Sequence, residues 1–112
     1  MESRLIYKLT RYRTNDIEIH WLNSTFENGA WIYIGDGEQI NREFVLKKIN
    51  EHFTDNILYV SWTRNESIEM SKENIESAIK GILGEHDFSI WDSKLRKVIQ
   101  FNKNGVMRLG EK

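Results

Sequence analysis

Histidine is the residue type in this sequence best suited to proton transfer near neutral pH or to metal binding, and three histidines are present. His20 lies in an alternating apolar stretch, His52 near the end of a helical pattern, and His86 directly before Asp87. No serine or cysteine stands near them in a setting typical of an activated nucleophile. Lys48 lies one helical turn before His52, so this helix offers no metal-binding pair. These patterns predict no catalytic residue and no metal site.

A second candidate for chemistry is Gly35-Asp36-Gly37, which follows a strand pattern and precedes a helical one. Phosphate-binding loops occupy this position in nucleotide-binding folds. A dinucleotide fingerprint would need a third glycine where Ile40 stands, and the chain has no Gly-Lys-Ser/Thr sequence. The chain also lacks cysteine, so thiol chemistry and disulfides are excluded. We therefore expect an ordinary strand-to-helix turn here, and no cofactor.

Carboxylates form two groups around the starts of the two predicted helices. The first group is Asp36, Glu38 and Glu43, and the second is Glu66, Glu69, Glu73 and Glu76. Acidic residues in the first turn of a helix are favoured by the helix dipole, which explains part of each group. The spacing of the second group predicts that Glu69, Glu73 and Glu76 share one exposed side. The excess of carboxylates beyond the first turn indicates a binding surface.

The net charge of −1 conceals an uneven distribution along the chain. Residues 14–92 carry 15 Asp/Glu against 6 Lys/Arg, whereas residues 93–112 carry six Lys/Arg against Glu111 alone. The first 13 residues are also basic and include Arg11-Tyr12-Arg13, which could stack on bases and contact phosphates. The overall balance is far from that of a typical nucleic-acid-binding domain, so we do not expect a nucleic-acid partner.

Four tryptophans are present, and tryptophan is a frequent anchor of protein interfaces. Trp62 and Trp91 each close a strand pattern beside charged loop residues, and we expect them at a partner-binding surface together with the acidic groups. Core positions are favoured for Trp21 and Trp31.

The element that organises the chain is Ile57 to Trp62, an almost continuously apolar and β-branched stretch. It predicts a central strand buried on both faces, where the helical patterns at 41–53 and 71–83 dock. Asn41 is the expected N-cap of the first helix, and 63–70 is expected to be a polar connection. Asn104-Gly105 predicts a type I′ hairpin turn. Further strands are expected at 3–9, 17–21, 30–34, 88–91, 95–101 and 106–109.

The predicted order is βββαβαβββ, which favours an α+β fold with a mostly antiparallel sheet of six to seven strands packed against two helices. At 112 residues the chain is expected to form a single domain, 1–112. No apolar run has the length of a membrane span or of a signal peptide, so we expect a cytoplasmic protein with no membrane partner.

In overall character, and in the closing stretch from Phe88-Ser89-Ile90-Trp91-Asp92 to Asn104-Gly105-Val106, the chain resembles bacterial immunity proteins of polymorphic and contact-dependent growth inhibition toxin systems. The resemblance implies a protein–protein interaction with a cognate toxin domain, a nuclease with a basic cleft, which the acidic surface would occlude. It implies a toxin inhibitor that is not an enzyme, and a monomer or weak homodimer. Two alternatives stay open: a small nuclease-like enzyme using His52 or His86, and a nucleic-acid-binding or adaptor module using Arg11–Arg13.

Overall fold

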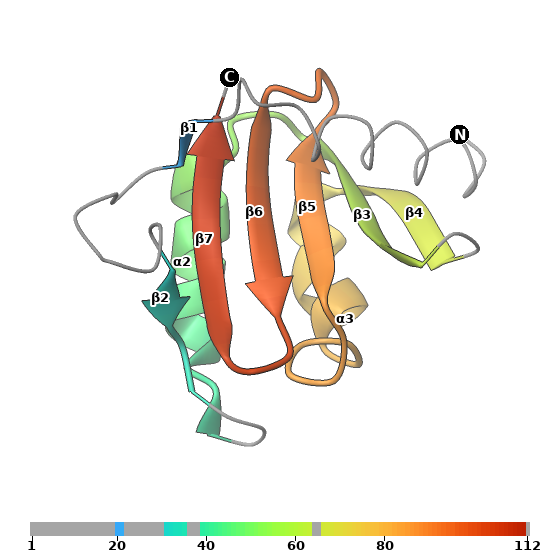
Figure 1. The fold of residues 1–112 in the computed structure, drawn as a ribbon. Coiled ribbons are helices and arrows are strands. Elements are labelled where there is room, and N and C mark those ends of the chain that lie inside the picture. The colour runs from blue at the N-terminus through green and yellow to red at the C-terminus, as the bar shows by residue number, and fades with distance from the viewer. Residues whose placement is uncertain (1–19, 22–30, 36–38, 64–65, 112) are drawn as a thin grey trace.

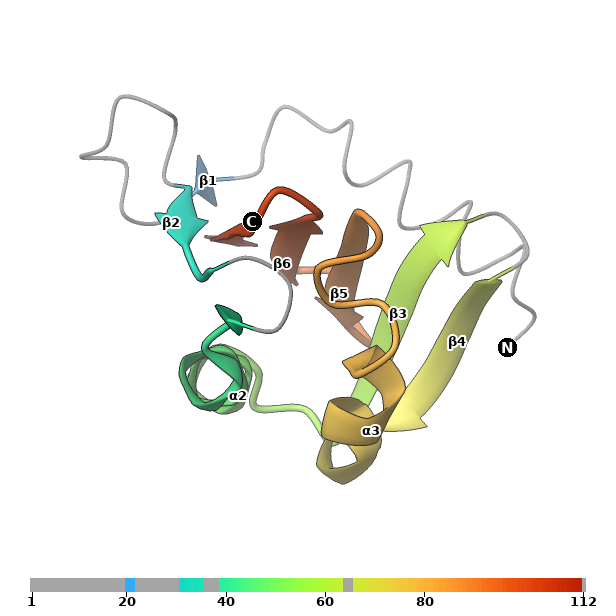
Figure 2. The same cartoon turned by 90° about the horizontal axis from the view of Figure 1, so that it is seen from below.

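The computed structural model describes residues 20–21, 31–35, 39–63 and 66–111. They form an α+β fold in which the helices cover one face of an antiparallel sheet (Figures 1 and 2). The predicted strand 3–9 and the residues Arg11–Arg13 lie outside the described part of the chain.

The strands follow one another across the sheet in the order β1-β7-β6-β5-β3-β4, and every pairing is antiparallel. Strands β1 and β2 pair with the same edge of β7, β2 at the beginning of that strand and β1 at its end. The strands are β1 (His20–Trp21), β2 (Ile32–Tyr33), β3 (Ile57–Thr63), β4 (Glu66–Ser71), β5 (Phe88–Asp92), β6 (Lys97–Asn102) and β7 (Val106–Glu111).

Helix α2 (Arg42–His52) begins as the sequence predicts. The side chain of Asn41 accepts a hydrogen bond of 3.1 Å from the Phe44 amide, which satisfies one of the free N–H groups of the first turn. Gly35 makes the preceding turn possible, because its φ of +105° is strained for any residue with a side chain.

The second helix is shorter than the periodicity predicts. A 3₁₀ turn, η2 (Lys72–Asn74), leads into α3 (Ile75–Ile79), and residues 80–84 continue as turns. Ile82 and Leu83 are nevertheless buried, as the apolar stripe requires. Gly81 and Gly84 have low helix propensity, so packing of the two apolar side chains decides the backbone path here. Gly84 has the positive φ expected after a helix, +84°.

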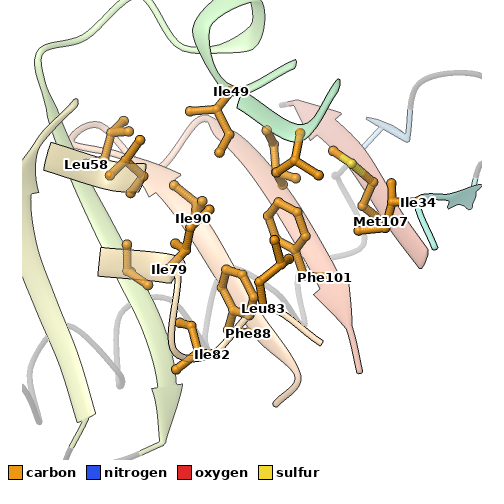
Figure 3. Close-up of a cluster of buried hydrophobic side chains, with 14 of the residues drawn as sticks. Ile34, Ile49, Leu58, Ile79, Ile82, Leu83, Phe88, Ile90, Phe101 and Met107 are labelled. Atoms are coloured by element: carbon orange, nitrogen blue, oxygen red, sulfur yellow. The ribbon is translucent and has the colours of Figure 1, made fainter. Parts of the chain in front are cut away.

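Strand β3 is an interior strand that pairs with β4 on one side and β5 on the other. Leu58 and Val60 are both 0% exposed, which confirms the burial expected of them. They join side chains from both helices and the sheet in the main core (Figure 3), where Ile49 of α2 and Ile79 of α3 approach Leu58 and Ile90.

Residues 63–70 do not form the polar connection that the sequence suggests. Most of this stretch lies in β4, at the edge of the sheet, so β3 is second from the edge rather than central. Ile68 pairs with Val60, and Met70 pairs with Leu58. The alternation of Ile68 and Met70 with polar residues is a period-two pattern, which the acidic residues of this stretch, Glu66 and Glu69, obscure.

The hairpin between β6 and β7 also differs in detail. Asn102 pairs with Val106 across three loop residues, and only Gly105 among them has positive φ, at +89°. A type I′ turn needs positive φ at both central residues, so that prediction is wrong. A three-residue loop with glycine in the left-handed position joins the strands instead.

A smaller cluster lies on the sheet face opposite the helices. It contains Tyr59, Trp91 and Val98, with Trp21 and Leu95 packed against it. Among the described residues no helix is long and apolar enough to cross a membrane.

Candidate functional site

The acidic side chains of the second predicted group lie where β4 turns into η2 and α3. Glu69 of β4, Glu73 of η2 and Glu76 of α3 are all exposed. Glu66 begins β4, and its side chain lies outside the description. We call this surface the β4–α3 edge; it consists of Glu69, Glu73 and Glu76 with the neighbouring side chains of Ile57 and Ile68.

The edge strand divides these carboxylates between two faces. Ile68 and Met70 lie on the helix-covered face because they pair with Leu58 and Val60 of the main core. Glu69 alternates with them and pairs with Tyr59, which belongs to the cluster on the other face. The expectation that Glu69 shares one side with Glu73 and Glu76 is therefore wrong: strand alternation applies to Glu69, and helical periodicity applies only from η2 onward.

Two exposed isoleucines flank Glu69. Ile68 of β4 is 42% exposed, and Ile57 of β3 is 39% exposed. By strand alternation Ile57 lies on the same face as Tyr59 and Glu69, whereas Ile68 lies on the helix-covered face. The β4–α3 edge thus combines apolar surface on both faces with carboxylates, which is the composition of a small interface centre with a charged rim.

Tyr59 is buried beneath this edge, directly across from Glu69. Burial, reinforced by the negative charge of Glu69, raises the pKa of Tyr59 above its ordinary value of 10.0. The phenol therefore stays protonated at neutral pH. It can donate a hydrogen bond there but cannot serve as a base.

The first predicted acidic group is only partly described. Glu43 is exposed in the first turn of α2, whereas Asp36 and Glu38 lie outside the described residues. Beside the start of α2, a groove against α3 is lined by Arg42, Glu76 and Lys80 over an apolar floor. Its volume of about 110 Å³ is below the ~300 Å³ of small-molecule sites. The groove mixes both signs of charge, because Arg42 and Lys80 line it beside Glu76, which also belongs to the β4–α3 edge.

Lys72 lies within the acidic region but is committed to helix α2. Its ammonium group donates to the carbonyl oxygen of Asn50 at 3.1 Å and to that of Phe53. These are carbonyls of the last turn and C-cap of α2, where a cation is favourable. Lys72 and Glu73 also line an open polar hollow with Asn50, Asn56 and Ser71.

Trp62 and Trp91 were both expected at the surface, and the structure describes the side chain of Trp91 only. Trp91 is 0% exposed, so it cannot reach a partner in this structure, and its expected role as an anchor is wrong. It sits on an interior strand between Tyr59 and Val98, where a large aromatic ring fills the second cluster. Its indole N–H has no hydrogen-bond partner among the described residues. Trp62 lies in β3, but its side chain is outside the description.

His52 is buried at the end of α2, and its Nε2 lies 2.9 Å from the carbonyl oxygen of Gly110. Burial lowers the pKa of His52 below 6.5, and the contact with Gly110 opposes this only in part. The imidazole is therefore neutral at pH 7 and donates its Nε2 proton to Gly110. This bond joins α2 to β7 and commits one of the two ring nitrogens of His52 to a structural contact.

His86 is exposed in the loop before β5. No hydrogen bond joins its ring to Asp87 among the described residues, and the Asp87 carboxylate accepts the Lys103 amide at 2.8 Å. Within the described ranges, no three His, Cys, Asp or Glu side chains gather closely enough to hold a metal ion.

One constellation was not foreseen from the sequence. The guanidinium carbon of Arg108, on β7, lies 3.7 Å from the ring centroid of Trp21 and 4.5 Å from that of Trp31. Trp21 ends β1, and Trp31 directly precedes β2. More than 75 residues separate the indoles from the arginine along the chain, so local periodicity carries no signal of this contact.

Comparison with known proteins gave no relative of this chain: no protein-family model, no curated protein and no solved structure matches it.

Proposed function

We propose that this chain is an immunity protein that binds and neutralises a cognate toxin, a nuclease, by occluding its active site with an acidic surface. The observation that supports this proposal is the β4–α3 edge. There, exposed carboxylates adjoin the half-exposed side chains of Ile57 and Ile68. The protein would act in the bacterial cytoplasm as a monomer or weak homodimer, without a cofactor.

In this proposal charge increases the rate of association with the toxin, and desolvation lowers the rate of dissociation. A nuclease cleft is basic because it binds phosphates, so carboxylates at the rim of an inhibitor accelerate encounter with it. Apolar side chains that become dry at the centre of the contact then slow dissociation. Ile57 and Ile68 supply such side chains beside Glu69, and no catalytic residue is needed.

The division of the carboxylates sets the shape of the proposed interface. Glu69 lies on one face of the sheet, whereas Glu73 and Glu76 follow the turn onto the helix-covered side. A partner that contacts all three must therefore span the edge of the sheet at β4 (Figure 2). This geometry favours a partner with a groove over one with a flat surface.

The test uses a toxin domain that a neighbouring gene encodes or that a pull-down with this chain recovers. We expect Glu69→Lys/Glu73→Lys to slow association at least about tenfold and to reduce the salt dependence of binding, because steering acts through rim charges. The melting temperature should stay at the wild-type value, since both side chains are exposed. Stopped-flow association at several salt concentrations, with calorimetric melting, measures both quantities.

A charge-matched control is Glu51→Lys/Glu85→Lys, which makes the same change at exposed positions outside the β4–α3 edge. It should retain most of the association rate. Equal losses in the two double variants would show that only net charge matters, and unchanged binding in both would remove the acidic-surface mechanism.

The alternative of a small nuclease is less well supported by the geometry. The Nε2 of His52 is committed to Gly110, and His86 lacks an orienting carboxylate. Cleavage of RNA or DNA by the purified protein, abolished by His86→Ala, would favour that alternative. A module that binds nucleic acid through Arg11–Arg13 rests on residues outside the description, and no observation favours it.

A further inference from the structure

The contact of Arg108 with two tryptophans lies at the β1–β7 edge, on the side of the sheet remote from β4 (Figure 1). Three short segments build it. Strand β7 carries Arg108, β1 carries Trp21, and Trp31 stands at the entry to β2, which also pairs with β7. All three side chains are half-buried. The guanidinium group is therefore held by tertiary structure and does not extend freely into water.

A hydrogen bond fixes the direction of this guanidinium group. The Nε–H of Arg108 donates to the side-chain oxygen of Gln100 at 2.8 Å, and the two residues are direct cross-strand neighbours of β7 and β6. An arginine has five N–H donors, and Nε carries one of them. Among the described residues, no acceptor contacts the four N–H groups on the two terminal nitrogens, and no carboxylate pairs with the charge.

This environment is costly for an isolated cation. Partial burial lowers the pKa of Arg108 below its ordinary value, because the charged form is less well solvated there than in water. The indole faces offset part of this cost through cation–π attraction. Within the described part of the chain, the Nε–H is the N–H group of Arg108 that is bonded, and the edge with the two terminal nitrogens is left for a ligand. That edge is a planar fork that matches two oxygens of a carboxylate or a phosphate.

We propose that Arg108, held by Trp21, Trp31 and Gln100, is a binding site for an oxyanion, a carboxylate or a phosphate group, which the terminal nitrogens of the guanidinium grip in bidentate fashion. The site goes beyond the proposed toxin binding and does not depend on it, since it lies at the opposite edge of the sheet from Glu69, Glu73 and Glu76.

A purely structural role would also use the contact, since cation–π packing fastens β1 and Trp31 to β7. The two roles differ in what they need from the side chain. The structural role needs a cation or an apolar stem packed against the indoles of Trp21 and Trp31, and lysine also supplies both. Oxyanion binding needs the fork, which lysine lacks. Arg108→Lys therefore separates the two roles.

The test is a titration of the full chain, labelled with ¹⁵N, followed by NMR through the arginine Nε–H and tryptophan indole N–H signals. Sodium phosphate is one arm and sodium acetate the other, each at constant pH and with sodium chloride holding the ionic strength constant. We expect a saturable shift of Arg108, with accompanying shifts of the Trp21 and Trp31 indoles. Saturation with phosphate alone identifies a phosphate site, and saturation with acetate alone identifies a carboxylate site. Saturation in both arms identifies a general oxyanion site.

Two comparisons complete the test. Arg108→Lys should weaken binding about tenfold or more through loss of the bidentate grip, whereas Arg42→Lys, at an exposed position on α2, should leave it unchanged. If Arg108→Lys does not fold, the wild-type spectrum still decides, because Arg42 and Arg96 serve as internal controls. An Arg108 signal that does not saturate in either arm, or that shifts no more than those of Arg42 and Arg96, would leave a structural contact only and overturn the proposal.

Discussion

Replacing Val60 by alanine tests the packing on which the whole fold depends. Val60 is 0% exposed on the helix-covered face of β3, between its cross-strand neighbours Ile68 and Ile90. The change removes two methyl groups, for which the loss of transfer free energy is about 1.6 kcal/mol. A small unfilled cavity adds to this, so we expect the free energy of unfolding to fall by about 2 kcal/mol.

The matched control is Ile68→Ala at the neighbouring position of the edge strand. It removes one carbon more, but Ile68 is 42% exposed. Water fills the space that the side chain leaves, so the loss should be about 1 kcal/mol or less. The larger truncation therefore has the smaller expected effect.

Urea denaturation followed by circular dichroism measures both variants, and calorimetry should show a melting temperature lower by about 8 °C for Val60→Ala. A loss for Ile68→Ala equal to or greater than that for Val60→Ala would contradict this expectation. It would show that the side chain of Ile68 is buried as deeply as that of Val60.

Two further predictions concern a buried titrating group and a strained turn. The pKa of His52 is lowered in the folded protein, so below pH 6.5 the unfolded chain binds a proton that the folded chain does not. Stability should therefore fall as the pH drops from 7 to 5, and His52→Gln, which cannot titrate, should show a smaller loss of melting temperature over this range. Gly35→Ala should destabilise the protein by about 1–3 kcal/mol, because its Cβ would stand 2.5 Å from the Gln39 carbonyl oxygen at a φ of +105°. Gly81→Ala places its Cβ in open space without positive φ, so chemical denaturation should show no loss; equal losses at Gly35 and Gly81 would contradict the turn argument.

Patterns in the sequence gave correct predictions where residues a few positions apart determine the local structure. Asn41 caps α2 because its side chain reaches an amide three residues away. The apolar run at 57–62 indicated an interior strand, since no alternating polar face was present to meet water. The closing meander also follows its local pattern, but β6 begins at Lys97 rather than at residue 95, and the type of the last turn differs.

The distribution of the acidic side chains over the two faces of the sheet could not be predicted from local patterns. Spacing alone placed Glu69, Glu73 and Glu76 on one side, on the assumption that a single helical periodicity governs them. Pairing with β3 turns the first of these residues into part of a strand, whose side chains alternate between the two faces of the sheet. The pairing depends on a neighbour that lies outside any short window of sequence.

Trp91 illustrates the same limit for burial. Its position at the end of an apolar strand beside charged residues suits a core filler and an interface anchor equally well. Its burial follows from its neighbours on both flanking strands, Tyr59 on β3 and Val98 on β6. Neither contact can be inferred from the sequence around Trp91 alone.

Composition and short-range periodicity were sufficient to predict the fold class, the cap of the first helix, the interior strand that carries Leu58 and Val60, and the absence of cysteine chemistry. Long-range pairing was needed to make β4 an edge strand that divides the carboxylates, to bond His52 to Gly110, and to bring Arg108 against two indoles. Each of these depends on residues distant in the chain that strand pairing brings together, and no local pattern records which strands will pair.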